Sequence, residues 1–462
     1  MSSALLVPLV VLLTAGAAPS PTICAAGKPT ELLEAGRKIQ REKAEGGVDE
    51  AIATYRQALA ADPGCASALW ELGWSYQVKG EWDRVLSEWD SLRALAPDYP
   101  QLAAEYPVAA KRKEQAAALK RLPNPGKLPP PEETPAAGEP IRFAAVGDIT
   151  MGKSWPVGAE RLPPNGGKQL FDGVKELLTA PDVTLGNLET VLADEGDSSK
   201  CGKRSTNCYA FRIPTSYAQV LKDVGFDVLT TANNHAGDFG PAGRKSTMAT
   251  LDRYGLKHSG VIGDVASWET KGKKIAMIGF SFGSDVHRIQ DIETARRLVA
   301  DVDRTHDLVI VFFHAGAEGK GADHVPHQTE MFLGENRGDS RAFAHAMIDA
   351  GADLLLGSGP HILRGMELYK GRLVAYSMGN FSSWNLFGLK GANGVSAVTD
   401  VTLAPNGVAL EVTLHPLVLE EPGLPVPDPQ KRAIERVRTL SKEDFGSELL
   451  DADGRWKRPT AN

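Results

Sequence analysis

An excess of basic residues is missing from this sequence, and cysteine is scarce. The formal charge is −7 over 462 residues, which excludes the strongly basic surface typical of nucleic-acid-binding proteins, so no nucleic-acid partner is expected. Residues 4–13 are apolar, but this run is too short to cross a bilayer, which takes about 20 residues. The 42% of apolar residues is enough to build a substantial core, and the length suits about two or three domains.

The N-terminal segment is typical of a secretory signal peptide. Its apolar run is followed at residues 14–18 by small residues that suit a cleavage site, so we predict a signal peptide at residues 1–18 although the first three residues include no Lys or Arg. Export would place the protein in the periplasm or cell envelope, with the membrane only as the site of export. Cys24 follows Ile23 rather than a small residue, which disfavours a lipid anchor there.

The four cysteines are compatible with an oxidising compartment. Cys201 and Cys208 bracket a short polar loop, and no second Cys or His pair lies nearby to complete a metal knuckle. This spacing predicts a disulfide between Cys201 and Cys208. Cys24 and Cys65 either pair with each other or stay free.

Residues 30–121 are predicted to be helical, with a period of 34 residues. Small, aromatic and proline positions recur at this spacing, with an insertion near residues 44–47. The period is typical of tetratricopeptide-like repeats, which bind peptides or proteins, so we expect a protein partner here. An ordinary helical hairpin is the alternative. The recurring positions are Ala51, Tyr55, Ala58 and Pro63, then Val85, Trp89, Leu92 and Pro97.

The rest of the chain is predicted to be an α/β domain behind a linker. Residues 122–140 are rich in proline and predict an extended linker. Residues 141–420 alternate strand and helix patterns, which predicts a layered sandwich, and the tail at residues 421–462 is expected to pack back on it. Predicted strands cover residues 142–146, 183–185, 228–231, 274–279, 308–313, 354–356, 372–376, 396–403 and 408–418, and predicted helices cover 169–178, 216–224, 340–350 and, more weakly, 430–440.

Polar side chains follow five of these predicted strands, where open α/β sheets build their sites. Each of them alone has an ordinary interpretation, such as a turn cap or a packed histidine. Their occurrence at five successive strand ends favours one shared site. In chain order they are Asp148; Glu189; Asn234, His235 and Asp238; His314 and Glu318; and His361.

These residue types indicate metal chemistry. Carboxylate and amide oxygens together with imidazoles suit a divalent transition metal such as Zn, Mn or Fe rather than calcium. One or two such ions can polarise a phosphoryl or acyl group and generate hydroxide near neutral pH. The long polar insertion at residues 320–337 is either a lid or a plain surface loop.

The ordered motifs resemble the CapA-type poly-γ-glutamate capsule synthesis family over residues 141–418. The resemblance implies a metallophosphatase-like, four-layer α-β-β-α fold. It implies that Asp148, Glu189, Asn234, His314 and His361 bind metal, and that His235, Asp238 and Glu318 form the catalytic group, with His235 as proton donor. The motifs are Gly147-Asp148-Ile149-Thr150-Met151-Gly152, Asn187-Leu188-Glu189, Ala232-Asn233-Asn234-His235 with Asp238 and Gly240, His314-x-Gly316-x-Glu318, Gly357-x-Gly359-Pro360-His361 and Tyr376-Ser377-Met378-Gly379-Asn380-Phe381.

Three positions depart from the pattern. The family commonly has a further histidine one or two residues before Pro360, where this chain has Ser358 and Gly359, and metallophosphatases at large have a histidine where this chain has Thr150. The resemblance implies a metal-dependent hydrolase of the cell envelope that handles poly-γ-glutamate or another anionic polymer, or a phosphate or acyl substrate. The missing histidines favour an alternative, a non-catalytic envelope scaffold or polymer-binding protein that is recruited through the helical repeats. A plain phosphoesterase without a capsule role is a third possibility.

Overall fold

The computed structural model describes residues 23–43, 47–156, 158, 161–198, 209–319, 321–386 and 388–458. The predicted signal peptide and the predicted Cys201–Cys208 disulfide lie outside these residues. Cys24 and Cys65 form a disulfide, which ties the segment before the first helix to the turn before the third. In the described part of the chain, none of the helices has the length and apolar character needed to cross a membrane.

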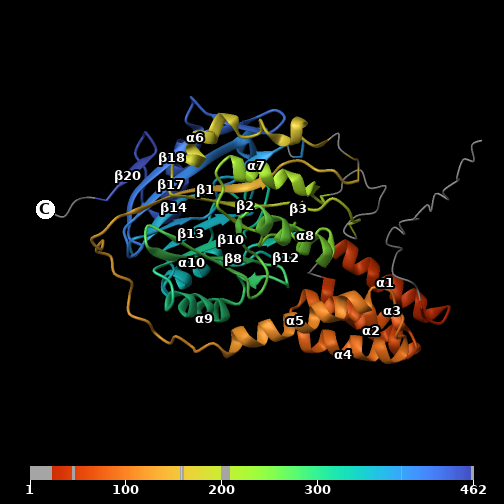
Figure 1. The fold of residues 1–462 in the computed structure, drawn as a ribbon. Helices are drawn as coiled ribbons and strands as arrows, with labels where there is room; N and C mark the ends of the chain where they lie inside the picture. Colours follow the sequence, from red (N-terminus) through yellow and green to blue (C-terminus); the bar gives the residue numbers. More distant parts are fainter. Residues whose placement is uncertain are drawn as a thin grey trace, which may run out of the picture.

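Five helices form the N-terminal module, each packed against the next in the sequence (Figure 1). Gly36 lies against Tyr55, and Gly73 lies against Trp89, so that a Cβ on either glycine would come within 2.4 Å and 1.9 Å of the facing ring. The same small-against-aromatic packing therefore occurs in both hairpins, at aromatic positions 34 residues apart. The helices are α1 (Lys28–Lys43), α2 (Val48–Ala61), α3 (Ala66–Val78), α4 (Trp82–Leu95) and α5 (Leu102–Arg121).

The first sheet has parallel strands in its middle and antiparallel strands at one side. Its order is β19-β18-β17-β1-β2-β5-β6, with β16 paired to β1 and β20 paired to β18. Strands β1, β2, β5 and β6 are parallel, whereas β17 to β19 form the predicted hairpin and its extension. The strands are β1 (Ile141–Thr150), β2 (Val183–Leu188), β5 (Val228–Thr230), β6 (Lys257–Ser259), β16 (Asn380–Ser383), β17 (Val395–Leu403), β18 (Ala409–Glu420), β19 (Leu424–Pro427) and β20 (Arg455–Lys457).

The second sheet faces the first. Its order is β14-β15-β13-β10-β8-β7, with β9 paired to β8, and the strands β15, β13, β10 and β8 are parallel. The strands are β7 (Val265–Thr270), β8 (Lys273–Ser281), β9 (His287–Arg288), β10 (Leu308–His314), β13 (Leu354–Ser358), β14 (Met366–Tyr369) and β15 (Arg372–Ala375).

Helices cover the outer faces of both sheets, so the predicted four-layer α-β-β-α sandwich is confirmed. Along β1, Phe143 and Ala145 belong to the core between the sheets, whereas Ala144 and Val146 belong to the core under the helices, because successive strand residues point to opposite faces. The helices α6 (Lys175–Thr179), α7 (Ala218–Asp223) and α8 (Gly240–Arg253) cover the first sheet, and α9 (Ile292–Asp303) and α10 (Ser340–Ile348) cover the second.

One predicted helix is wrong in its first half. Residues 169–171 form a turn and Asp172–Val174 a 3-10 turn, so the α-helix begins only at Lys175. Gly173 disfavours a helix here, and it packs close to the backbone of β19, where an added Cβ would lie 3.1 Å from the carbonyl oxygen of Pro425. Packing against β19 thus prevents the first half of the predicted helix from forming, although its sequence has a helical periodicity.

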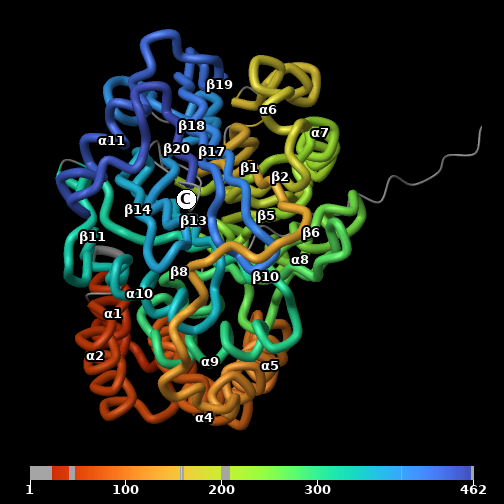
Figure 2. The backbone as a smooth tube through the Cα atoms, turned by 90° about the vertical axis from the view of Figure 1, so that its left-hand side faces the viewer, coloured from red at the N-terminus to blue at the C-terminus, as the bar shows by residue number. Residues whose placement is uncertain are grey.

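The predicted linker follows the surface of the sandwich before it enters β1. Residues 122–140 contain no helix or strand, and they pass close to α9 on the way to β1 (Figure 1). Arg297 donates to the carbonyl of Leu122, and Asn406 donates to that of Thr134. From the tail, α11 (Arg432–Phe445) packs against β14, β17 and β18. Figure 2 shows the helical module below the sandwich, with α5 beside α9.

Candidate metal centre

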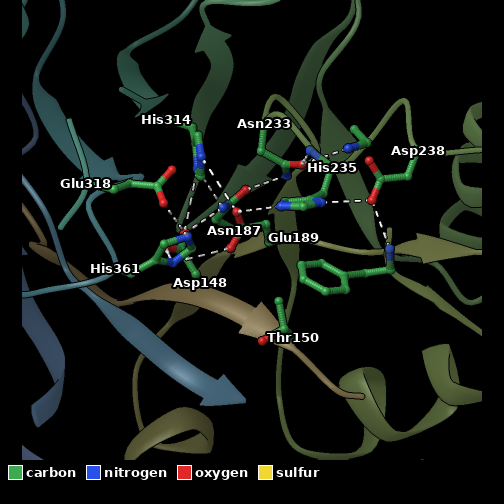
Figure 3. A network of polar contacts seen from close by, with 12 residues as sticks. Asp148, Thr150, Asn187, Glu189, Asn233, His235, Asp238, His314, Glu318 and His361 are labelled. Carbon is green, nitrogen blue, oxygen red and sulfur yellow. Dashed lines mark hydrogen bonds and ion pairs between the residues drawn. The ribbon is translucent and has the colours of Figure 1, made fainter. Parts of the chain in front are cut away.

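The ends of strands from both sheets meet at one point. Asp148 lies near the end of β1, Glu189 directly follows β2, His314 ends β10, and His361 follows β13. Within the first sheet Asp148 lies opposite Asn187, and within the second His314 lies opposite Ser358. Parallel strands bring their carboxyl ends to the same edge, and the facing of the two sheets brings both edges together (Figure 3).

Asp148, Glu189, His314 and His361 form a tight, buried group. Oδ2 of Asp148 lies 3.1 Å from Nδ1 of His361, and Oε2 of Glu189 lies 3.8 Å from the same nitrogen. Oε1 of Glu189 lies 3.7 Å from Nε2 of His314. Asp148, Glu189 and His361 each place one ligand atom within 4.8 Å of the others, as an ion bound to all three requires.

Several polar atoms of this site are buried without a hydrogen bond from any described residue. Such atoms are costly unless something satisfies them, and a cation would do so. Asn234 belongs to this set through its amide oxygen, although no hydrogen bond or ion pair in the described chain joins it to the other four residues. The donor types match a divalent transition metal. The atoms are Oδ2 of Asp148, Oε1 and Oε2 of Glu189, Oδ1 of Asn234 and Nε2 of His314.

The electrostatics of the group reflect crowded negative charge. Burial raises the pKa of Asp148, but the neighbouring imidazoles of His314 and His361 outweigh this effect and hold that pKa well below its usual range. Burial and then the charge of Asp148 raise the pKa of Glu189 well above its usual range. Burial lowers the pKa of His361, but Glu189, Asp148 and Glu318 raise it to about 10. A bound cation would neutralise this excess of negative charge.

His235 is held in a single orientation beside this group. Its Nδ1 donates to Oδ2 of Asp238 over 2.8 Å, and its Nε2 lies 4.0 Å from Oε1 of Glu189. The ring of Phe211 packs on the imidazole at 4.3 Å between centroids. Asp238 also accepts the backbone N–H of Phe211. The sequence-predicted pair His235 and Asp238 is therefore in contact, with Nε2 turned toward Glu189.

Glu318 contacts the site from the second sheet. Its Oε2 lies 3.9 Å from Nε2 of His361, and its Oε1 accepts from Arg337 over 3.0 Å. The guanidinium of Arg337 lies 4.1 Å from the centre of the Phe282 ring and also pairs with Glu335. Arg337 was not predicted as a site residue, because it lies in the insertion and reaches the site only through Glu318.

Two asparagines of the site were also not assigned a role from the sequence. Asn187 donates to Oδ1 of Asp148 over 2.7 Å, lies 3.2 Å from Nδ1 of His314, and accepts from Asn233. Asn380 accepts from Nδ1 of His361 over 2.9 Å. Both residues lie within motifs that resemble the capsule synthesis family, and this was the sequence feature that could have identified them. Only the pairing of β1 with β2 and β16 shows which residues they contact.

The three departures from the family pattern leave no replacement ligand. Ser358 places its hydroxyl 3.1 Å from Nδ1 of His314. Thr150 donates to the carbonyl of Ser382 and points away from the group (Figure 3). Gly359 has a φ of 120°, and an added Cβ would lie 2.6 Å from the carbonyl of Ala315, so this backbone excludes any side chain there.

The insertion that follows His314 is anchored at two points along its length. Within residues 321–337, Glu330 makes a buried, two-pronged ion pair with Arg364, at 2.7 Å and 3.0 Å. His324 and the backbone of Val325 both bond to Asp444 in α11. The insertion is therefore a wall beside the site that the C-terminal helix supports, rather than an unsupported surface loop.

Comparison with known proteins agrees with the motif order. Residues 142–384 match the family described as bacterial capsule synthesis protein PGA_cap. The chain is 28% identical to the PGA biosynthesis protein CapA of Bacillus subtilis, over 55% of this chain and 67% of that protein. It is 27% identical to the capsule biosynthesis protein CapA of Bacillus anthracis, over 63% and 70%. A probable polyglutamine synthesis accessory protein of Mycobacterium tuberculosis is 29% identical, over 44% and 56%.

Among solved structures, a 5′-nucleotidase precursor from Thermus thermophilus is 12% identical, with a TM-score of 0.34 over 66% of this chain and 59% of that one. A purple acid phosphatase from yellow lupin is 12% identical, with a TM-score of 0.32 over 64% and 56%. These scores are low, and the fold assignment does not depend on them. The family match covers more than half of the chain and contains every residue of the site described above, from Asp148 to Asn380. The chain therefore belongs to the bacterial capsule synthesis protein family.

Proposed function

We propose that this protein is an exported, metal-dependent hydrolase of the cell envelope, with a phosphatase-like site, that acts in the synthesis or handling of a capsule polymer such as poly-γ-glutamate. The observation that carries the proposal is the set of buried carboxylate, imidazole and amide atoms that lack hydrogen-bond partners at the meeting point of two sheets. The polymer is inferred from the names of the relatives, which refer to capsule and polyglutamate synthesis.

Five side chains would hold the metal: Asp148, Glu189, Asn234, His314 and His361. When bound, a divalent ion would supply Lewis-acid polarisation of the bond to be cleaved. The protein's own contribution is to fix these ligands. Asn187 and Asn380 orient Asp148 and His361, and the burial of these groups limits their movement, so that a water molecule admitted with the substrate could attack the bond to be cleaved.

His235 would donate a proton to the leaving group. Because Asp238 accepts the Nδ1 proton, the ring presents Nε2 on the side of Glu189, and a protonated Nε2 can protonate an oxygen or nitrogen that leaves there. The contact with Phe211 limits rotation of the ring. Arg337 and Glu318 hold the opposite side of the site through His361.

A second candidate function is favoured by the three departures. With Ser358, Gly359 and Thr150 in place of histidines, fewer nitrogen ligands are available than the family pattern offers. A protein that keeps the fold but lacks turnover would bind polymer or hold a complex together, recruited through its helical module.

Metal content and turnover separate the two functions. The purified full chain is expected to contain a divalent transition metal near one equivalent or more by elemental analysis, and Asp148→Ala is expected to lose most of it. His235→Ala is expected to keep the metal but lose about 100-fold or more of the hydrolytic rate on a phosphoester or γ-glutamyl amide, because a general acid typically contributes about 10²- to 10⁴-fold.

His306→Ala serves as the control, because this half-buried histidine lies before the start of β10, at the opposite end of that strand from His314, and contacts Ser267. Full activity in His235→Ala would contradict the assigned role. A wild-type protein without stoichiometric metal, together with normal polymer output in a strain carrying Asp148→Ala and Asn234→Ala, would replace the hydrolase with the scaffold.

A further inference from the structure

A cavity of about 320 Å³ separates the helical module from the sandwich. One wall comes from α5 and the α3–α4 turn, and the other from β8, β9 and the start of α9. The metal group lies at the strand ends between the two sheets, whereas this cavity lies on the outer face of the second sheet. It is therefore distinct from the candidate metal centre, and its volume is at the lower end of ordinary ligand sites.

The cavity is positively charged although the protein as a whole is negative. Lys79, Lys120 and Arg288 line it, against the single carboxylate of Asp291. Lys79 is ion-paired with Asp49 over 2.6 Å. Lys120 and Arg288 have no carboxylate partner in the described part of the chain. Two uncompensated cations thus face the same space, one from each wall.

The remaining polar groups of the cavity can both donate and accept hydrogen bonds. Ser284 and Thr294 add hydroxyl groups. The cavity also meets the first turn of α9, a 12-residue helix whose dipole favours negative charge at that end. The carboxylate of Asp291 is already engaged there, since it accepts the N–H of Thr294. The cations and the helix end therefore favour an occupant that carries negative charge.

Much of the remaining lining is apolar, and these apolar residues are called the floor below. Trp82 and Leu119 contribute to it from the helical module, and Phe280 and Leu298 from the sandwich. A compact anion such as phosphate would leave this surface uncovered. An acidic chain with methylene groups between its carboxylates would cover the floor and reach Lys120 and Arg288 together.

From this complementarity we propose that the cavity binds a short stretch of a polyglutamate chain. The choice of polyglutamate rests on the proposed function, because the polymer is inferred from the names of related proteins. Because the cavity lies between the helical module and the sandwich, both parts of the protein would contact the bound polyglutamate, at a place separate from the candidate metal centre. Polymer binding should accordingly survive the loss of the metal.

Binding of a γ-linked glutamate oligomer to the full chain, measured by calorimetry at low and high salt, tests the proposal. Lys120→Glu is expected to weaken binding about fivefold or more at low ionic strength, and less at high salt, because one exposed charge contributes on the order of 1 kcal/mol and is screened. Lys111→Glu is the matched control. It lies nine residues earlier on the same helix, which places it on about the opposite face, and it does not line the cavity.

Equal weakening by Lys120→Glu and Lys111→Glu would overturn the site. Tight binding of an α-linked glutamate oligomer without the γ-linked one would overturn the occupant in favour of an acidic segment of a protein partner. Loss of binding in Asp148→Ala would place the oligomer at the metal centre instead. Retained binding in Asp148→Ala, with loss in Lys120→Glu, supports the cavity even if the protein shows no hydrolysis. Circular dichroism of Lys120→Glu checks that this exposed change leaves the fold intact.

Discussion

Asn187 organises the candidate metal centre without being one of its predicted ligands. Its amide nitrogen lies within 2.7 Å of Asp148 and 3.2 Å of His314, which come from different sheets, and Asn233 fixes its amide oxygen. One side chain thereby sets the distance between a carboxylate and an imidazole that would share an ion. Metal sites depend on such outer contacts almost as strongly as on the ligands.

Replacing Asn187 with Ala is therefore expected to weaken metal binding. Loss of an outer partner typically costs about 10- to 100-fold in affinity, and the expected loss here lies in that range because two ligands lose their support. Titration of the metal-free protein with Zn or Mn measures it. Thr150→Ala is a matched control, since Thr150 is also buried on this edge but bonds to Ser382 instead. Unchanged affinity in Asn187→Ala would show that the strands alone position the ligands.

At the scale of elements, the site depends on how closely β16 approaches β1. Gly147 has no room for a side chain, because a Cβ would lie 1.9 Å from the carbonyl oxygen of Gly379. That approach lets Asp148 donate its backbone N–H to Gly379 and brings Asn380 beside His361. Gly147, which precedes Asp148 in the motif, is therefore required by the close packing of the two backbones.

Gly147→Ala is expected to lower the free energy of unfolding by about 1–3 kcal/mol, the usual cost of overpacking, because the two backbones must move apart. Urea unfolding followed by circular dichroism measures it. Gly283→Ala is the control, since the nearest atom to its added Cβ is a Val286 methyl at 3.8 Å. Equal effects of the two changes would mean that β16 can shift freely.

The sequence predicted the elements that carry strong patterns. The apolar runs of β1, β2, β5, β10 and β13 and the residues after them were identified because buried parallel strands read as continuous apolar segments. The short polar strand β16 (Asn380–Ser383) was not identified, since its four residues show no alternation. The contacts of Asn187 and Arg337 were not predictable either, because they depend on strand register and on how the insertion folds back.

At the scale of the whole molecule, the candidate centre joins the two halves of the sandwich. Asp148, Glu189 and Asn234 come from the first sheet, and His314 and His361 come from the second. An ion held by both sets would link the sheets at the edge where the core between them ends. Without it, burial and the charge of Asp148 raise the pKa of Glu189 well above its usual range, so the site favours a proton on Glu189 where a bound ion would otherwise balance the two carboxyl groups.

Metal should therefore stabilise the folded chain as a whole, and a chelator should destabilise it. Binding to the native state alone adds about 2.7 kcal/mol when the free ion is present at 100 times its dissociation constant, so the thermal midpoint of the protein is expected to rise with added Zn or Mn and to fall with EDTA. Differential scanning calorimetry measures both shifts. Asp148→Ala should show neither, because the bridging set is broken. The opposite result would be a thermal midpoint of the unmodified protein that does not change with added metal, although elemental analysis finds the ion bound. Metal binding would then not link the two sheets, and the apolar core between them alone would hold them together.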